Sequence, residues 1–427
     1  MPDDRGPEPG RPREVLRLRP FALFWSATTI RAVGSAIAGV ALQVLIVTVL
    51  NASALEISIL SALGVLPYLF LGLIVGALMD RWRRQRVLVV TSIGRAIVLA
   101  SIPVLLLLDA LSVWSLAAII LALGVLVLFA QSAEQPFLPR IVPRDSLVMA
   151  NARLGQSETV AGTAGPALGG VLLNLIGAPL LFVFDAVINT VSAILQSRIK
   201  VEETKPEPRA AGRHIGHDIA EGMRYTYRHR TLRPLAISVH IWFLGNSIVA
   251  TLFGVFVLRE LAVPPWAFGI TLTAAGVGGF LGALFAPRIG DRLGAGRAIL
   301  LGRILVVLPW LALAVLPLTA STSLVVVIVV VSAAQFLYGL AMGIEDANDM
   351  GYRQAVAPDA IQGRMNSTIR TMNRIVFFFG ALIAGVLATH LGYALTLGIG
   401  AAIFAVAALV VLVSPLRTAR HDDPVDS

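Results

Sequence analysis

Long apolar runs separated by short polar connections repeat along the whole chain. Runs such as residues 121–130 and 324–334 contain no charged side chain, and they do not alternate apolar with polar positions as the strands of a membrane β-barrel would. A helix of about 20 apolar residues crosses the hydrocarbon core of a bilayer. The pattern therefore predicts an all-α membrane protein with twelve transmembrane helices, near residues 21–48, 55–79, 87–108, 113–135, 151–175, 178–198, 235–258, 265–287, 298–317, 322–345, 366–389 and 393–414.

Composition agrees with this pattern. Of the 427 residues, 57% are hydrophobic and 14% are charged, and the mean hydropathy is +0.82. Soluble proteins are typically about 45–50% apolar and about 25% charged, so a soluble enzyme and a coiled coil are excluded. The chain has no cysteine, which excludes disulfides and thiolate chemistry. The first apolar run is too long for a signal-peptide core, so we expect an uncleaved anchor.

Basic residues gather in alternate connections between the predicted helices. Arg81 to Arg86 lie in one such connection, and Arg140 and Arg144 lie in the next but one. The intervening connections, at residues 51–54, 109–112 and 177–179, contain no Lys or Arg, and Arg259 is the single basic residue on a later one. Because short cytoplasmic loops carry an excess of Lys and Arg, both termini are predicted to be cytoplasmic, in a bacterial-type plasma (inner) membrane. The net charge of +9 thus reflects topology, and no nucleic-acid partner is expected.

The composition changes abruptly between residues 200 and 233, where charged residues and proline replace the apolar runs. Within this segment Ile215, Ile219, Met223 and Tyr227 recur every four residues, which predicts an amphipathic helix. Such a helix either lies on the inner membrane surface or packs on the bundle, and the pattern favours neither. The predicted organisation is a cytoplasmic tail (1–19), a six-helix bundle (20–199), a cytoplasmic linker (200–233), a second six-helix bundle (234–415) and a cytoplasmic tail (416–427).

The two halves repeat each other. Gly76-Ala77-Leu78 before a basic loop, followed by Gly94-Arg95, reappears as Gly282-Ala283-Leu284 and Gly302-Arg303. Pro143 and Asn151 are also echoed by Pro358 and Asn366, and both pairs have the same separation along the chain. Parallel repeats about an axis along the membrane normal are a transporter architecture, with the substrate path at their interface. The alternative is chance similarity between apolar sequences.

Several motifs resemble those of one transporter superfamily. The segment from Gly76 to Arg86 resembles the loop between spans 2 and 3 of the major facilitator superfamily, and Gly165-Pro166-Ala-Leu-Gly169-Gly170 is similar to its antiporter-associated signature. Segments 221–233 and 354–365 resemble the macrolide-efflux and enterobactin-exporter branch, and the likeness extends over residues 20–415. The resemblance implies two pseudo-symmetric six-helix bundles and proton-driven export. Ser35 and Ser92 stand where that branch often has acidic residues, so a coupling carboxylate is expected elsewhere.

The resemblance also implies a cytoplasmic latch between the halves. Asp80, at the inner end of span 2, can accept hydrogen bonds from the free amides that begin span 11, near 366–370. Arg81 and Arg84 beside it either contribute to the latch or only enforce topology, and Gly76 opens the motif. The glycines and proline of the 165–170 motif carry no side-chain chemistry. They either bend the helix for transport or allow ordinary close packing.

Ionisable residues inside predicted spans are expensive and mark functional candidates. Helical rise places Arg31 near mid-membrane and Glu158 about 10 Å from the inner side, so the geometry allows an ion pair between them, either exchanging during transport or fixed. Glu134 either lines the cavity or is a solvated helix end. Further candidates are Asp185, for which a structural hydrogen bond to neighbouring helices is expected, and the path-facing or packing residues His240, Asn246 and Arg374.

The sequence therefore predicts a secondary active efflux transporter, not an enzyme, that moves a small amphipathic organic compound outward by alternating access. No ATP-binding loop or metal-ligand cluster is evident, so no cofactor is expected and the proton gradient is the expected energy source. A dedicated exporter of one endogenous metabolite, such as a siderophore or self-made antibiotic, is the first alternative. A non-transporting membrane sensor or scaffold is the second. The expected state is a monomer in the lipid bilayer.

Overall fold

The computed structural model describes residues 15–79, 81–201, 215–318 and 323–420. All regular secondary structure in these residues is helical. The main helices are α1 (Arg19–Val44), α2 (Ala54–Met79), α3 (Arg84–Leu107), α4 (Val113–Ile141), α5 (Leu147–Ser197), α6 (Ile215–Arg228), α7 (Leu232–Val255), α8 (Pro265–Leu293), α9 (Ala295–Val315), α10 (Leu324–Val356), α11 (Asp359–Leu391) and α12 (Tyr393–Val413). The predicted all-α membrane fold is confirmed.

Two predicted spans are joined in α5. Its 51 residues would extend about 77 Å as one straight helix, far more than a bilayer core, at 1.5 Å per residue. At Gly177 the backbone leaves the helical region (φ 78°, ψ 163°), a conformation that glycine adopts without penalty. The helix therefore consists of two arms, residues 147–176 and 178–197, which are the fifth and sixth spans. With these arms the described chain contains the twelve predicted spans.

Several helices extend beyond their predicted apolar runs. The prediction ended the tenth span at residue 345, whereas α10 continues to Val356, and α4 continues to Ile141. Charged side chains interrupt an apolar run in the sequence. A helix nevertheless continues past them when neighbouring protein groups pair with their charges. In α10 the added turns carry Asp349 and Arg353, which form an ion pair.

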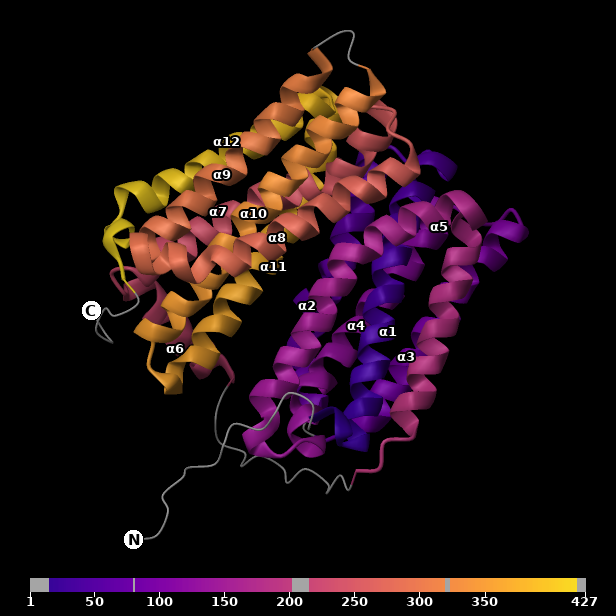
Figure 1. Ribbon diagram of the computed structural model, residues 1–427, viewed down its shortest axis with the longest axis horizontal. Coiled ribbons are helices and arrows are strands. Elements are labelled where there is room, and N and C mark those ends of the chain that lie inside the picture. The colour runs from indigo at the N-terminus through magenta and orange to yellow at the C-terminus, as the bar shows by residue number, and fades with distance from the viewer. Residues whose placement is uncertain (1–14, 80, 202–214, 319–322, 421–427) are drawn as a thin grey trace.

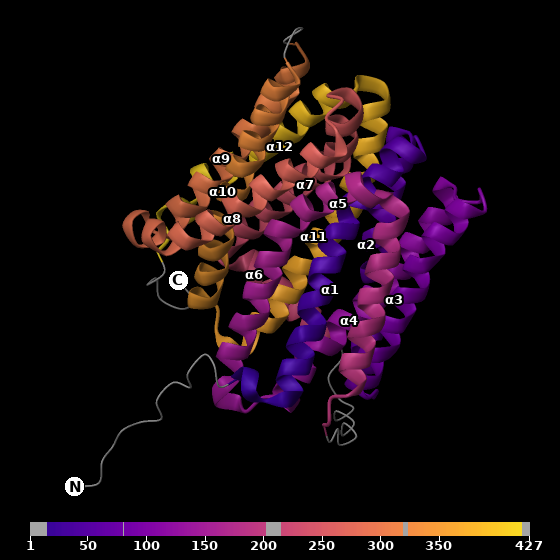
Figure 2. The same cartoon turned by 45° about the vertical axis from the view of Figure 1, so that its right-hand side comes forward.

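The helices form two bundles (Figure 1), and Figure 2 shows the same division from a second direction. The first half contains α1–α5 and the second contains α7–α12. Across the boundary α5 lies against α8, and α2 lies against α11. A π-helical turn ends the first helix of each half, at Leu45–Val49 and at Phe256–Glu260. The two π-helical turns therefore occupy equivalent positions in the two halves.

Glycines at the repeat spacing make equivalent contacts within the two halves. Gly165 of α5 is so close to α1 that a methyl group there would overlap Ala36. Its counterpart Gly380 of α11 is equally close to α7, where a methyl group would overlap the hydroxyl of Ser247. Small residues allow this close approach of membrane helices. Each half therefore packs its fifth span on its first span through a glycine.

A second pair of glycines at the same spacing lies between the halves. A Cβ at Gly170 would lie 2.9 Å from the carbonyl oxygen of Trp266 and 3.2 Å from Cα of Gly269, both on α8. A Cβ at Gly385 would lie 2.6 Å from Cβ of Ser58 on α2. Each bundle thus contributes one glycine of this pair to a contact with the other bundle.

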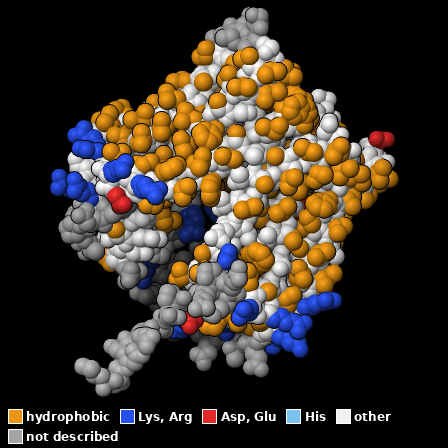
Figure 3. Space-filling model, viewed as in Figure 1, with side chains coloured by type: hydrophobic (Ala, Val, Ile, Leu, Met, Phe, Trp, Pro, Cys, Tyr) orange, Lys and Arg blue, Asp and Glu red, His pale blue; other side chains and the backbone are white. Residues whose placement is uncertain are grey.

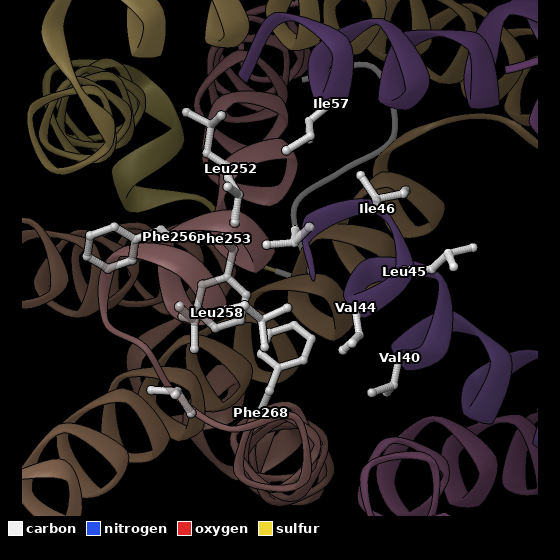
Figure 4. Packing of buried hydrophobic residues seen from close by; sticks show 14 of the residues in the cluster. Val40, Val44, Leu45, Ile46, Ile57, Leu252, Phe253, Phe256, Leu258 and Phe268 are labelled. Carbon is white, nitrogen blue, oxygen red and sulfur yellow. The ribbon is translucent and has the colours of Figure 1, made fainter. Parts of the chain in front are cut away.

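One end of the molecule is sealed by apolar side chains from both halves. Val44, Leu45 and Ile46 at the end of α1 belong to the same buried cluster as Phe253 and Phe268 of the second half. Figure 4 shows these side chains approaching one another from the two bundles. Arg259 donates from Nη2 to the carbonyl oxygen of Val47 across the boundary, at 2.9 Å. We call this the far end.

The bundles separate at the opposite end, which we call the linker end because α6 and both described chain ends lie there (Figure 1). Figure 3 shows a hollow between the halves on this side, with basic side chains inside it. Exposed arginines follow the helix ends here, among them Arg81, Arg140, Arg144, Arg288 and Arg292. The structure is therefore closed at the far end and open at the linker end.

The linker helix α6 packs on the second half. A Cβ at Gly222 would lie 2.8 Å from the carbonyl oxygen of Arg364 on α11, and Arg364 also forms an ion pair with Glu221 at 2.5 Å. Thr226 is buried, whereas Met223, on the predicted apolar face, is 41% exposed. The helix therefore uses the face of Gly222 and Thr226 for packing, because small side chains allow close contact with α11.

Candidate functional site

A small polar cavity of about 240 Å³ lies in the first half, between α1, α4 and α5. Glu134 of α4 lines it and forms an ion pair with Arg31 of α1, whose side chain is 12% exposed. Glu158 lines the same cavity but is exposed and makes no ion pair with any residue that the structure describes. The predicted pair of Arg31 with Glu158 is therefore wrong. Arg31 instead meets Glu134 of α4, and Glu158 does not reach it although it lines the same cavity as Glu134.

A larger polar cavity of about 490 Å³ lies mainly in the second half, between α7, α9, α10 and α11, and Gln135 of α4 contributes to its wall from the first half. Arg303 of α9 and Glu345 of α10 form a buried ion pair at its wall, with Nη2 and Oε1 2.7 Å apart and side chains only 1% and 4% exposed. The guanidinium carbon also lies 5.6 Å from the ring centre of Trp242. The two charges must stay matched, because an unmatched buried charge is very unfavourable.

A second ion pair lines this cavity one turn further along α10. Arg353 binds Asp349, four residues earlier, through both Nε and Nη2. Glu134 and Asp349 have the same separation along the chain as the repeated prolines Pro143 and Pro358. Both halves therefore place a carboxylate that is paired with arginine at the equivalent position of the fourth helix.

A third cavity, of about 960 Å³, lies between the first arm of α5 and the helices α8 and α10. It spans the boundary between the halves and is lined mainly by glycine, alanine and larger apolar side chains. Among the described residues of its lining Asp346 is the single charged one, and it also lines the 490 Å³ polar cavity. Small-molecule pockets typically have about 300–1,000 Å³ and mostly apolar walls with few polar groups.

Arg374 of α11 joins the two halves. Its guanidinium carbon lies 3.5 Å from the ring centre of Tyr68 on α2. The Tyr68 hydroxyl donates to Oε1 of Gln131 on α4, at 2.8 Å. A cation over an aromatic face contributes about 0.5–2 kcal/mol, more when water is excluded. Arg374, a predicted path residue, thus contacts the opposite half.

His240 of α7 connects the linker helix to the polar cavity. Its Nε2 lies 2.7 Å from the hydroxyl of Tyr227 on α6, and its Nδ1 lies 2.7 Å from Oδ1 of Asn373, which lines the cavity. Since the amide oxygen only accepts, Nδ1 carries a proton. Burial raises the pKa of Tyr227, which keeps this residue a hydroxyl donor at neutral pH. Both ring nitrogens of His240 are thus satisfied.

Asn246 lies further along α7 and accepts a hydrogen bond from the Tyr338 hydroxyl of α10 at 2.8 Å. Tyr338 lines the apolar 960 Å³ cavity. This bond holds α7 and α10 together beside the cavity. Asn246 therefore supports the cavity wall indirectly, because it holds Tyr338, which lines the cavity.

Asp185 is buried in the second arm of α5. It accepts a hydrogen bond from Nδ2 of Asn189 at 3.0 Å, one turn along the same arm, rather than from a neighbouring helix as predicted. Gly34 of α1 faces the Asp185 carboxylate. The neighbouring Ser35 accepts from Nη2 of Arg95 at 2.9 Å. Asp185 therefore occupies a packed contact between α1 and α5.

The latch motif is described only in part. Asp80, its central carboxylate, lies outside the described residues. Gly76 and Arg81 are exposed, and Arg84 donates from Nη1 to the carbonyl oxygen of Pro136 on α4 at 3.3 Å. Within the described part, the motif arginine thus contacts its own half.

The 165–170 motif lies where the fifth span contacts two helices at once. Gly165 and Gly169 face α1, whereas Gly170 faces α8 of the other half. The carbonyl group of Pro166 approaches Gly269 of α8, where a side chain would overlap it. Close packing, one of the two predicted interpretations, is therefore present, and part of it lies at the boundary between the halves.

Sequence reasoning missed Glu345, Asp346 and Asp349 because it ended the tenth span at the first of them. The internal repeat held the missing signal. The recurrence of Gly94-Arg95 as Gly302-Arg303 indicated a second intramembrane arginine, and the repeat spacing indicated a counterpart of Glu134 at Asp349. Within the described residues no group of three or more potential metal ligands occurs.

Comparisons with known proteins agree with this architecture. A family model described as "Transmembrane secretion effector" matches residues 13–427. The multidrug efflux pump Tap of Mycolicibacterium fortuitum is 26% identical over 357 residues, which cover 80% of this chain and 83% of that protein. A variant of the nucleoside transporter NupG has a TM-score of 0.74 at 12% identity, over 92% of this chain and 99% of that one. A bacterial homologue of the iron transporter ferroportin, solved in an inward-facing state, has a TM-score of 0.69 at 15% identity, over 93% and 98% of the two chains. The chain belongs to the transmembrane secretion effector family of the major facilitator superfamily, and it is a multi-pass transporter of the inner membrane, not an enzyme.

Proposed function

We propose that this protein exports amphipathic organic compounds by alternating access, with inward proton flow as the driving force. The observation that carries the proposal is the arrangement of two repeated halves that are sealed at the far end and separated at the linker end. In alternating access two bundles rock about a central site and open it to each side in turn. A structure that is open at only one end supports this proposal, because alternating access requires such a form.

The distribution of charge supports the direction. Exposed arginines surround the opening at the linker end, which by the positive-inside rule is the cytoplasmic side. A carrier open to the cytoplasm collects its cargo there. Tap, which shares 26% identity with this chain, is named as a multidrug efflux pump. Export of drug-like compounds therefore agrees with both the opening and the relative.

The paired carboxylates supply groups that can respond to protons. Glu134 is bound to Arg31 in the first half, and Asp349 is bound to Arg353 in the second. Protonation of either carboxylate removes its charge and releases the arginine, since a neutral carboxyl no longer balances the cation. Released arginines repel one another or seek new partners, which changes the relative energies of the two states. We therefore assign proton coupling to these pairs rather than to Glu158.

Everted membrane vesicles test the proposal. With an acidic interior, vesicles containing the protein should accumulate Hoechst 33342 or radiolabelled erythromycin, and collapse of the gradient with nigericin should abolish accumulation. Glu134→Gln should lose gradient-driven uptake, whereas Glu158→Gln, a matched change on the same cavity, should retain it. Failure of wild-type vesicles to accumulate any compound of a broad amphipathic panel would refute the function. Equal behaviour of the two glutamine variants would refute the assignment of Glu134.

A further inference from the structure

Asp346 has a position that none of the other acidic residues described in the membrane shares. Among the described residues it is the one that lines both the 960 Å³ apolar cavity and the 490 Å³ polar cavity. Its side chain is exposed to these spaces and makes no direct hydrogen bond or salt bridge with any residue that the structure describes, and its charge interacts at longer range with those of Arg303 and Arg353. The neighbouring carboxylates differ, because Glu345 is bound to Arg303 and Asp349 to Arg353.

The residues around the Asp346 carboxylate favour a ligand with a positive charge. On the side of α5 and α8, the described wall of the cavity contains Gln156 and threonines as its polar residues but no cation. On the other side, Arg303 and Arg353 are held by their own carboxylates, and Arg370 of α11 lines the polar cavity. A compound in the apolar cavity therefore meets one formal charge on the described wall, and that charge is negative. A carboxylate at the edge of an apolar space attracts a cation more strongly than one in bulk water, because the effective dielectric constant is lower there.

We infer that Asp346 is the anchor of a binding site for amphipathic organic cations, whose apolar body occupies the large apolar cavity between α5, α8 and α10. The cationic group lies at Asp346, and any polar extension continues into the polar cavity beyond it. This inference rests on the proposed function and specifies both the substrate class and the place where it binds. The cavity lies beside the contact of Thr163 with Gly276, where α5 meets α8, so a ligand in it touches both halves.

Gly162 offers a way to fill the apolar cavity without disturbing its walls. It lines the cavity, and a Cβ built there meets nothing within 4 Å. A leucine at this position therefore occupies ligand space and removes room for any compound, whatever its charge. Asp346→Asn, in contrast, keeps the shape and removes only the charge. The two variants separate shape from charge in a single binding experiment.

The test is equilibrium binding to the purified full-length protein in lipid nanodiscs. The probes are tetraphenylphosphonium and the neutral tetraphenylsilane, which carry the same four phenyl groups on a tetrahedral centre. The wild-type protein should bind the cation more tightly than the neutral compound. Asp346→Asn should weaken cation binding about 10- to 100-fold, the size expected for a charge-assisted contact, and change binding of the neutral compound little. Gly162→Leu should weaken binding of both probes by a similar factor.

Two further variants serve as a rescue and as a control. Asp346→Glu restores a carboxylate and should recover most of the preference for the cation, and Asp291→Asn, an exposed change at the linker end, should bind both probes like the wild type. Equal binding of the two probes by the wild type would overturn the inference. Unchanged cation binding in a folded Asp346→Asn protein would do the same. Transport of neutral compounds by vesicles would then still support the proposed function, so the two failures are distinguishable.

Discussion

Gly385 should control the balance between the two states of the carrier. It lies at the contact of α11 with α2, where the halves meet near the far end. The new methyl group of Gly385→Ala would lie 2.6 Å from Cβ of Ser58 and 2.9 Å from the carbonyl oxygen of Ala54. Carbon atoms pack best at about 3.5–4.0 Å, so the two helices must separate locally by about 1 Å. The change therefore disfavours the conformation that is closed at the far end.

The expected size follows from the cost of overpacking. Inserting a methyl group into a closely packed contact costs about 1–3 kcal/mol. Because this contact belongs to the closed far end, the cost falls on that conformation and changes the ratio of the two states about 5- to 150-fold. The linker end should accordingly spend more time closed. Ser58→Gly in the same protein removes the overlapped side chain but leaves the carbonyl oxygen of Ala54 in place, so it should restore the original ratio in part.

Spin-label distances measure this ratio directly. The chain contains no cysteine, so Asp145→Cys and Asp291→Cys, at exposed linker-end positions of the two halves, can be labelled specifically. Electron–electron double resonance should show a longer distance in the parent protein and a growing shorter-distance population in Gly385→Ala. Gly380→Ala is the matched control, since its methyl group overlaps Ser247 within one half and should lower thermal stability without changing the distances. Identical distance distributions in the two alanine variants would refute this reasoning.

Three further contacts have measurable consequences. Glu345→Ala leaves Arg303 buried without its partner and should cost about 3–5 kcal/mol in thermal unfolding, whereas replacing both residues with apolar ones should cost much less; equal losses would contradict the buried pair. Tyr68→Leu removes the ring beneath Arg374 and should weaken the structure open at the linker end by about 0.5–2 kcal/mol in the spin-label assay, and a phenylalanine in its place should behave like the parent. Gly222→Leu should detach α6 from α11 and speed amide hydrogen exchange in α6, and unchanged exchange would show that the close contact does not hold the helix.

The ion pairs show which properties of intramembrane residues can be predicted from the sequence and which cannot. Counting residues along a helix gives depth, and it placed Arg31 near mid-membrane, Glu158 nearer the inner side and Glu134 at the inner end of its span. It does not give the rotation of each helix about its axis. That rotation and the packing of the helices decide which carboxylate reaches Arg31. Glu134 of α4 pairs with it, whereas Glu158 of α5 lines the same cavity as Glu134 but does not reach Arg31.

The residues missed in α10 have a different cause. A span predicted from hydropathy ends at the first cluster of charges, yet Glu345 and Asp349 are held inside the bundle by arginines. The cost of burying one charge is offset by the other only when the two helices, or two turns of one helix, are already in place. The internal repeat was a better guide than hydropathy, because it compares equivalent positions in two copies of one architecture.

The amino-acid sequence by itself determined the number of spans, their approximate ends and the division into two related halves. These properties follow from the length of apolar runs, the position of basic loops and the recurrence of motifs, all of which are local or periodic along the chain. Only the tertiary structure decided which end is sealed, which carboxylates are paired and that Asp346 stands between two cavities. Those features depend on helix rotation and on contacts between residues far apart in the chain, and such contacts exist only once the two bundles have packed.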